Sequence, residues 1–142
     1  MNNYFEIKVK SKISNESFIR ATIAAFCVEL EPTLEQLNDV KTAVSEAFTN
    51  CVVHGYSRDP SKDVLIKVSL SENKAIIEIT DNGCGMGDVE KAMQPFYTSK
   101  PEEERSGMGF TLMQTFMDEV QVKSEVGKGT TVIMEKSFNK NA

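Results

Sequence analysis

Three polar residues interrupt an apolar stretch near the middle of the chain at intervals of four. Glu46, Asn50 and His54 lie within SEAFTNCVVHG, whose other residues are mostly small or apolar. Residues four apart share one face of a helix, so the three side chains could reach one site. A buried carboxylate needs a partner, an amide oxygen suits Mg²⁺, and a carboxylate can take a proton from an attacking hydroxyl. The competing interpretation is a solvated Glu46 and a His54 that favours the helix C-terminus.

A glycine-rich loop, TDNGCGMG, forms the second polar cluster. Asp81 comes at the end of an apolar strand, and Gly83, Gly85 and Gly87 follow it. Glycine permits close approach of the backbone to a ligand and positive φ angles. A carboxylate placed there can accept a hydrogen bond from an exocyclic amine such as that of adenine. The loop is therefore a candidate base-binding segment, with an ordinary tight turn as the alternative.

The third cluster, RSGMGF, opens a helix after a long irregular segment. Exposed N–H groups and the helix dipole favour anions at such an end, and Lys100 and Arg105 add positive charge. Alternatively, the glycines only break the chain and the charges are solvated. Neither standard phosphate-binding fingerprint is present, so a nucleotide site would be of another type. Irregular segments of this length are often lids, and we expect a lid at approximately residues 95–107.

The elements that would position these clusters follow from hydrophobic periodicity. The pattern predicts one α+β domain over residues 1–142, with a mostly antiparallel sheet and helices on one face. Ser14 is the expected cap of the first helix, Thr33 and Gln36 resemble a capping box, and Gly55 is the expected C′ residue of the long helix. The expected strands cover 4–10, 64–70, 75–79, 119–124 and 130–136, and the expected helices cover 14–30, 33–55, 89–93 and 108–116.

Composition narrows the possible functions of this 142-residue chain. No apolar run approaches the ~20 residues of a membrane helix, and the N-terminus lacks a signal-peptide pattern. We therefore expect a cytoplasmic protein that does not bind a membrane. A net charge of −5 without a basic stripe disfavours direct binding of nucleic acid. Cys27 and Cys51 lie in apolar helical stretches and are expected to be core thiols, and no zinc or disulfide pattern is present.

Taken in order, ExxxNxxxHG, DxGxG, GxG and GKGT resemble the boxes of the GHKL ATP-binding superfamily. The resemblance extends from about Glu46 to Thr130 and implies a Bergerat α/β sandwich that binds ATP and Mg²⁺. By the same resemblance Glu46 is the general base, Asn50 is the Mg²⁺ ligand and Asp81 binds the adenine amine. The remaining nucleotide contacts that it implies are Gly83, Gly85, Met86, Lys100, Arg105, Ser106, Gly107, Met108, Gly109 and Thr130.

Within the superfamily, the HGY sequence and the small size are similar to the anti-sigma-factor serine kinases, and most similar to those of sporulation. That resemblance implies a homodimer that inhibits a sigma factor and phosphorylates a serine of an anti-anti-sigma factor. The alternative function is a non-catalytic binding module gated by ATP and ADP. Glu16 and Arg20, four apart on the first helix, form either a solvated pair or a docking surface for these partners.

Overall fold

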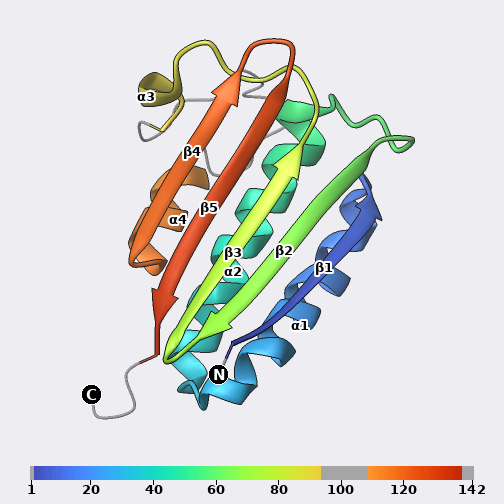
Figure 1. Cartoon of the computed structure of the whole chain (residues 1–142). Helices are drawn as coiled ribbons and strands as arrows, with labels where there is room; N and C mark the ends of the chain where they lie inside the picture. Colours follow the sequence, from blue (N-terminus) through green and yellow to red (C-terminus); the bar gives the residue numbers. More distant parts are fainter. Residues whose placement is uncertain (1, 94–108, 139–142) are drawn as a thin grey trace.

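The computed structural model describes residues 2–93 and 109–138. Five strands form one sheet in the order β1-β2-β3-β5-β4, and every neighbouring pair is antiparallel (Figure 1). Helices α1, α2 and α4 lie behind this sheet, on one face, whereas α3 lies beside the upper end of β4. The predicted α+β class is therefore confirmed. The strands are β1 (Asn3–Lys10), β2 (Asp63–Ser71), β3 (Lys74–Asp81), β4 (Glu119–Glu125) and β5 (Gly129–Ser137).

Alternating side chains explain why the sheet buries one face. Val64, Ile66, Val68 and Leu70 of β2 are buried, whereas the residues between them are exposed. Since side chains of a strand alternate between faces, this pattern places the apolar set against the helices. The inward face of β3 follows the same rule. It ends with Asp81, a carboxylate in a row of apolar side chains.

Four α-helices lie in the described part of the chain. They are α1 (Glu16–Cys27), α2 (Leu34–Asn50), α3 (Val89–Ala92) and α4 (Gly109–Phe116). One face of α2 packs into the core, where Val40, Val44 and Ala47 are fully buried. Cys27 and Cys51 are also buried and free, as expected. None of the helices described is long and apolar enough to cross a membrane.

The two ends of α2 were predicted with different success. Thr33 and Gln36 form the capping box: each side chain accepts a hydrogen bond from the other residue's backbone N–H, at 3.1 and 2.9 Å. At the other end, α2 continues into a π-helical turn, Cys51–Gly55. Gly55 ends the helical run, but it is absent from the residues with positive φ. Its predicted role as a left-handed C′ residue is therefore wrong.

The predicted start of the first helix is also wrong. Ser14 lies inside a 3₁₀ turn, Ile13–Asn15, and α1 begins at Glu16. The side chain of Asn15 does not cap α1. It donates instead to the carbonyl of Lys10, at 2.9 Å. A second 3₁₀ turn, Val28–Leu30, extends the helical segment to the predicted end.

A buried lysine fixes α4 against the sheet. Lys136 of β5 is only 8% exposed. Its ammonium donates to the Phe116 carbonyl at 2.6 Å and lies 3.5 Å from an Asp39 carboxylate oxygen on α2. A cation at a helix C-terminus is favourable because the last carbonyls carry partial negative charge. Lys136 thus ties the end of α4 to the sheet and to α2.

Candidate functional site

The candidate site lies where β3, the β4–β5 turn and the end of α2 meet, at the upper end of the molecule in Figure 1. The register places Asp81 of β3 opposite Thr130 of β5, and Thr130 opposite Ser124 of β4. Three polar residues from three neighbouring strands therefore lie in one row. Asp81 is only 3% exposed, so its carboxylate requires hydrogen-bond donors.

Those donors come from segments far apart in the sequence. The Gly83 N–H donates to Asp81 Oδ1 at 2.9 Å. Burial raises the pKa of Asp81 above its usual value, while hydrogen bonds from Gly83, the Cys51 thiol and the Thr130 backbone oppose that rise. A carboxylate offers about four acceptor positions. Asp81 can therefore accept a further donor, such as the amino group of a base.

Cys51 belongs to this site as well as to the core. Burial raises its pKa strongly, and the neighbouring Asp81 charge raises it further. The thiol is therefore protonated at neutral pH and donates to Asp81. Because Cys51 directly follows Asn50, this hydrogen bond ties the end of α2 to the end of β3. The apolar stretch around Cys51 predicts a core thiol only, and no sequence pattern indicates its bond to Asp81.

The three glycines of the loop differ in how closely other atoms approach them. A Cβ at Gly83 would lie 1.9 Å from the Gly55 carbonyl oxygen. Gly85 has a φ of +71°, and its Cβ would lie 2.1 Å from the Glu125 carbonyl oxygen. The nearest neighbour of a Cβ at Gly87 would be 3.6 Å away, an ordinary contact. Gly83 and Gly85 thus let backbone segments of the protein approach one another, and a contact of either with a ligand remains a prediction.

Hydrogen bonds join the glycine loop to the π-helical turn on one side and to the β4–β5 turn on the other. The Cys84 N–H donates to the Gly55 carbonyl at 3.0 Å, and the Gly127 N–H donates to the Cys84 carbonyl at 2.7 Å. The Cys84 thiol donates to the His54 carbonyl at 3.1 Å. The glycine loop is thus held between the π-helical turn and the β4–β5 turn.

Ser124 is a polar residue of the site that no sequence motif indicates. Its hydroxyl accepts from the Met86 N–H at 2.7 Å, lies 2.7 Å from Thr130 Oγ1 and donates to the Gly129 carbonyl at 3.1 Å. It therefore fixes Met86 and Thr130, two residues that the family resemblance assigns to the nucleotide. A single serine in an alternating strand gives no signal of this role.

The row Glu46–Asn50–His54 is only partly regular. Glu46 and Asn50 lie one turn apart on α2, and both are half-buried. His54 lies beyond them, in the π-helical turn. His54 therefore belongs to a different kind of helical turn from Glu46 and Asn50. Its role, to orient a neighbour or to cap the helix, remains a prediction.

A hollow of about 300 Å³ lies at the same end of the sheet. It includes Asp81 and Thr130 among its lining residues, whereas Glu46 and Asn50 are not among those that the structure places there.

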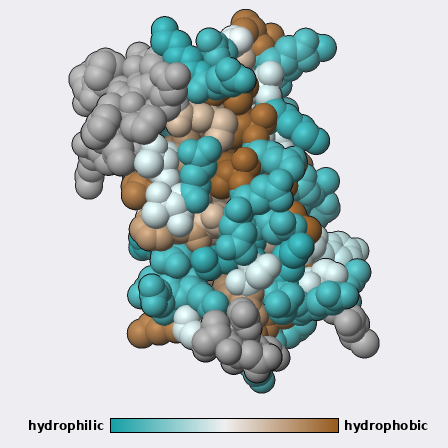
Figure 2. Space-filling model, turned by 90° about the vertical axis from the view of Figure 1, so that its left-hand side faces the viewer, coloured by the Kyte–Doolittle hydropathy of each residue, from teal (hydrophilic) through white to brown (hydrophobic). Residues whose placement is uncertain are grey.

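Figure 2 shows the side of the molecule with α3, α4 and β4, where hydrophobic surface in the upper half lies between hydrophilic residues. The hollow is lined by Thr80, Asp81, Asn82, Lys123, Ser124, Glu125, Lys128, Gly129, Thr130 and Thr131.

Of the six predicted phosphate contacts, the structure describes only Gly109. Gly109 is buried and is the first residue of α4. Lys100, Arg105, Ser106, Gly107 and Met108 lie outside the described residues, as does the predicted lid. Within residues 2–93 and 109–138, no group of three or more His, Cys, Asp or Glu side chains could hold a metal ion.

Glu16 and Arg20 form the predicted i,i+4 pair. Arg20 Nη1 lies 3.1 Å from Glu16 Oε1. The Ser45 hydroxyl of α2 also donates to this carboxylate oxygen. Glu16 therefore connects α1 to α2 and is less exposed than a simply solvated pair would require. A role of these two residues in docking a partner remains a prediction.

The geometry agrees with the similarity of this chain to known proteins. The family described as histidine kinase-like ATPase domain matches residues 10–136. The chain is similar to the anti-sigma F factor of Clostridium perfringens (strain 13 / Type A), with 51% identity over 139 residues, which covers 98% of this chain and 99% of that protein. It is also similar to the anti-sigma F factor of Caldanaerobacter subterraneus subsp. tengcongensis, with 53% identity over 140 residues, 99% of this chain and 97% of that protein.

A solved structure shares the fold. The crystal structure of RsbU and RsbW domains from Mycobacterium tuberculosis matches with a TM-score of 0.68 at 18% identity. The match covers 96% of this chain and 32% of that one. These findings define the chain as an ATPase domain of the histidine kinase type. Because it shares more than half of its residues with these relatives over nearly its whole length, the chain belongs to the anti-sigma F factor family.

Proposed function

We propose that this chain binds ATP at the candidate site and is an anti-sigma factor with protein serine kinase activity. The observation that carries the proposal is Asp81, a buried carboxylate at the end of β3 that retains acceptor capacity. The family of histidine kinase-like ATPase domains adds support for a nucleotide.

The residues take distinct roles in this proposal. Asp81 accepts from the adenine amine, with Gly83, Gly85, Met86 and Thr130 around the base and ribose. Asn50 would supply an amide oxygen to Mg²⁺, and the metal ion would neutralise phosphate charge. The phosphates lie against Lys100, Arg105, Ser106, Gly107, Met108 and Gly109.

Glu46 would be the general base. It would take the proton of a serine hydroxyl as the serine oxygen bonds to the terminal phosphate and ADP leaves. Glu46 lies one helical turn from Asn50, so base and metal ligand would act on the same end of the nucleotide. General bases typically contribute about 10²–10⁴ in rate.

The relatives named anti-sigma F factors suggest the partners. We propose that this chain holds a sporulation sigma factor away from RNA polymerase and phosphorylates a serine of its anti-anti-sigma factor, which then cannot release the sigma factor. We also propose a homodimer, one domain over residues 1–142, a lid near residues 95–107 and a cytoplasmic location. Glu16 and Arg20 are the proposed docking residues, to be tested by charge reversal at Arg20.

A labelling assay tests the kinase. Wild-type protein, Glu46→Gln and the control Glu35→Gln, an exposed position in the first turn of the same helix, are each incubated with γ-labelled Mg-ATP and an extract of the source cells. We expect one small protein labelled on serine by the wild type and the control, and labelled about 10²–10⁴ times more slowly by Glu46→Gln. Equal labelling by all three would refute the role of Glu46. ATP binding without any label would favour the nucleotide-gated binding module.

A further inference from the structure

Tyr56, which is not among the predicted site residues, joins β2 to the start of the glycine loop through its hydroxyl. Its hydroxyl donates to the Asp63 carbonyl at 2.7 Å and accepts from the Asn82 N–H at 2.6 Å. The residue follows the π-helical turn and is only 9% exposed. Burial raises the pKa of its hydroxyl, so the proton donated to Asp63 is present at neutral pH. The phenol oxygen is then free to act as the acceptor for Asn82.

This bridge stands where the β2–β3 ladder stops. Leu65 pairs with Thr80, and the same register, continued by two residues, would put Asp63 opposite Asn82. An antiparallel ladder would join such a pair directly. Here the Tyr56 hydroxyl stands between the Asp63 carbonyl and the Asn82 N–H instead. Tyr56 therefore marks the point at which the chain leaves β3 for the glycine loop.

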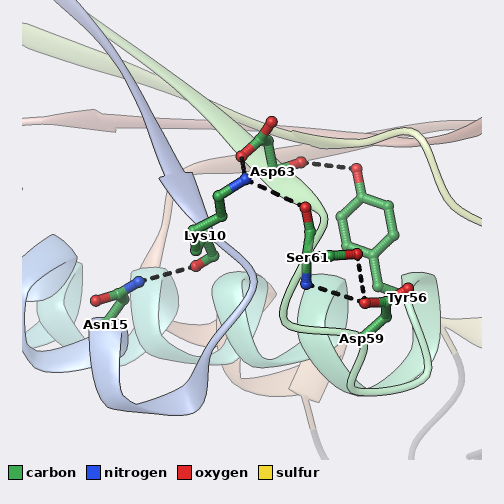
Figure 3. A network of polar contacts seen from close by, with 6 residues as sticks. All are labelled: Lys10, Asn15, Tyr56, Asp59, Ser61 and Asp63. Atoms are coloured by element: carbon green, nitrogen blue, oxygen red, sulfur yellow. Dashed lines mark hydrogen bonds and ion pairs between the residues drawn. The ribbon is translucent and has the colours of Figure 1, made fainter.

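The Asp63 side of the bridge is firmly anchored (Figure 3). The Lys10 ammonium lies 3.1 Å from the Asp63 carboxylate and donates to the Ser61 carbonyl at 3.2 Å. Asp59 Oδ1 accepts from both the backbone N–H and the hydroxyl of Ser61, at 2.9 and 2.7 Å. The segment that presents the Asp63 carbonyl is thus tied to β1 and closed on itself. Tyr56 transfers this fixed position to Asn82.

The Asn82 side of the bridge leads into the nucleotide site. Asn82 lies between Asp81 and Gly83, and the Gly83 N–H donates to the Asp81 carboxylate. Fixing the Asn82 amide therefore fixes the peptide units on both sides of it, which set the direction of that carboxylate. Without the phenol oxygen, the Asp63 carbonyl at the start of β2 and the Asn82 N–H at the start of the loop would lose their partner. An unpaired buried polar group is costly.

We propose that Tyr56 is a positioning residue of the nucleotide site, which holds the Asp81 carboxylate in its binding orientation through the backbone of Asn82. This inference rests on the proposed function, since it assumes that Asp81 binds the base. It predicts a defect in affinity rather than in phosphoryl transfer, because the bridge lies at the adenine end of the site. ATP and ADP share the adenine and should be affected equally.

The test compares wild type, Tyr56→Phe and Tyr4→Phe, which removes a phenol hydroxyl from a side chain that is 73% exposed on β1. Calorimetric titrations with Mg-ATP and Mg-ADP are made well below the unfolding temperature of each variant. We expect Tyr56→Phe to bind both nucleotides roughly tenfold more weakly, with a KM for ATP raised to match and a kcat within threefold of wild type. Tyr4→Phe should bind as wild type does. A merely structural role would leave the affinity of the folded protein unchanged.

Affinities of Tyr56→Phe equal to those of wild type would overturn the proposal, as would a kcat lowered with unchanged affinity. Hydrogen exchange gives a second measurement that does not depend on the variant's folding. The Asn82 amide of wild type should exchange slowly, and exchange as fast as in an unstructured peptide would also overturn the proposal. A wild type that binds no nucleotide would refute the proposed function itself, an outcome distinct from equal binding by both proteins.

Discussion

Gly55 offers the sharpest test of the site geometry, because its α-carbon faces the Asp81 carboxyl. A Cβ at residue 55 would lie 2.6 Å from both Cγ and Oδ2 of Asp81. Ordinary van der Waals contact for such an atom begins at 3.4 Å. In Gly55→Ala either the carboxyl or the π-helical turn must therefore move by about 0.8 Å.

Neither group can move without loss. Asp81 is held by the Gly83 N–H and the Cys51 thiol, and the Gly55 carbonyl accepts from the Cys84 N–H. Overpacking of this kind typically costs about 1–3 kcal/mol of stability, and a misplacement of about 1 Å can cost about 10²-fold in a positioned site. We expect the Gly55→Ala variant to unfold with about 1–3 kcal/mol less free energy and to bind Mg-ATP at least tenfold more weakly.

Gly87→Ala is the matched control, since it adds the same methyl group to the glycine loop at a position where the nearest atom would be 3.6 Å away. Urea unfolding gives the stability, and calorimetric titration of the folded proteins gives the affinity. The control should bind as wild type does. If Gly55→Ala bound Mg-ATP as tightly as Gly87→Ala, the Asp81 carboxyl would not be the group whose position determines affinity, and the reasoning would fail.

Two further predictions follow from the pKa shifts at this site. Because burial raises the pKa of Asp81 above its ordinary 3.8, the folded state binds more protons than the unfolded state above that pH, so stability decreases as pH rises through this window. As pH rises above 3.8, the urea resistance of Asp81→Asn should therefore increase relative to that of wild type, while the variant loses affinity for Mg-ATP. A relative decrease would contradict the direction of the pKa shift. Since burial raises the pKa of Cys27 to about 12 and that of Cys51 well above its usual value, whereas Cys84 is exposed, iodoacetamide should modify Cys84 alone in the folded protein at pH 8, as mass spectrometry of peptides would show. Rapid modification of Cys51 would place it outside the packed site.

Elements with strong local signals were predictable from the sequence. The alternation in β2 and β3 and the capping box of α2 depend on contacts between residues close in the chain, so their patterns survive in the sequence. The inward position of Asp81 also follows from the period of two along β3. These features suffice to predict the sheet, its helical face and the end of the sheet at which a site would lie.

The interior of the site could not be predicted, because it depends on approaches between distant backbones. Nothing near Gly55 in the sequence indicates that Asp81 will lie against it. The sequence predicts the end of the helical run at Gly55, but not that Gly55 faces the Asp81 carboxyl. Ser124 and Tyr56 bond backbone groups 38 and 26 residues away. Such roles become visible only once the β4–β5 turn and the π-helical turn are placed around the glycine loop.

The features that escaped prediction share a physical origin in the burial of Asp81. A carboxylate on the apolar face of a sheet is unfavourable unless donors surround it, and a thiol, a glycine N–H and a close-packed turn supply that environment here. Three features around Asp81 depart from regular secondary structure. They are a π turn at the end of a helix, glycines where backbone segments touch, and a phenol hydroxyl in place of a hydrogen bond between two strands. Local rules are commonly broken at functional sites. The stability that the fold gives up around Asp81 is thus itself an argument that this carboxylate is retained for binding rather than for folding.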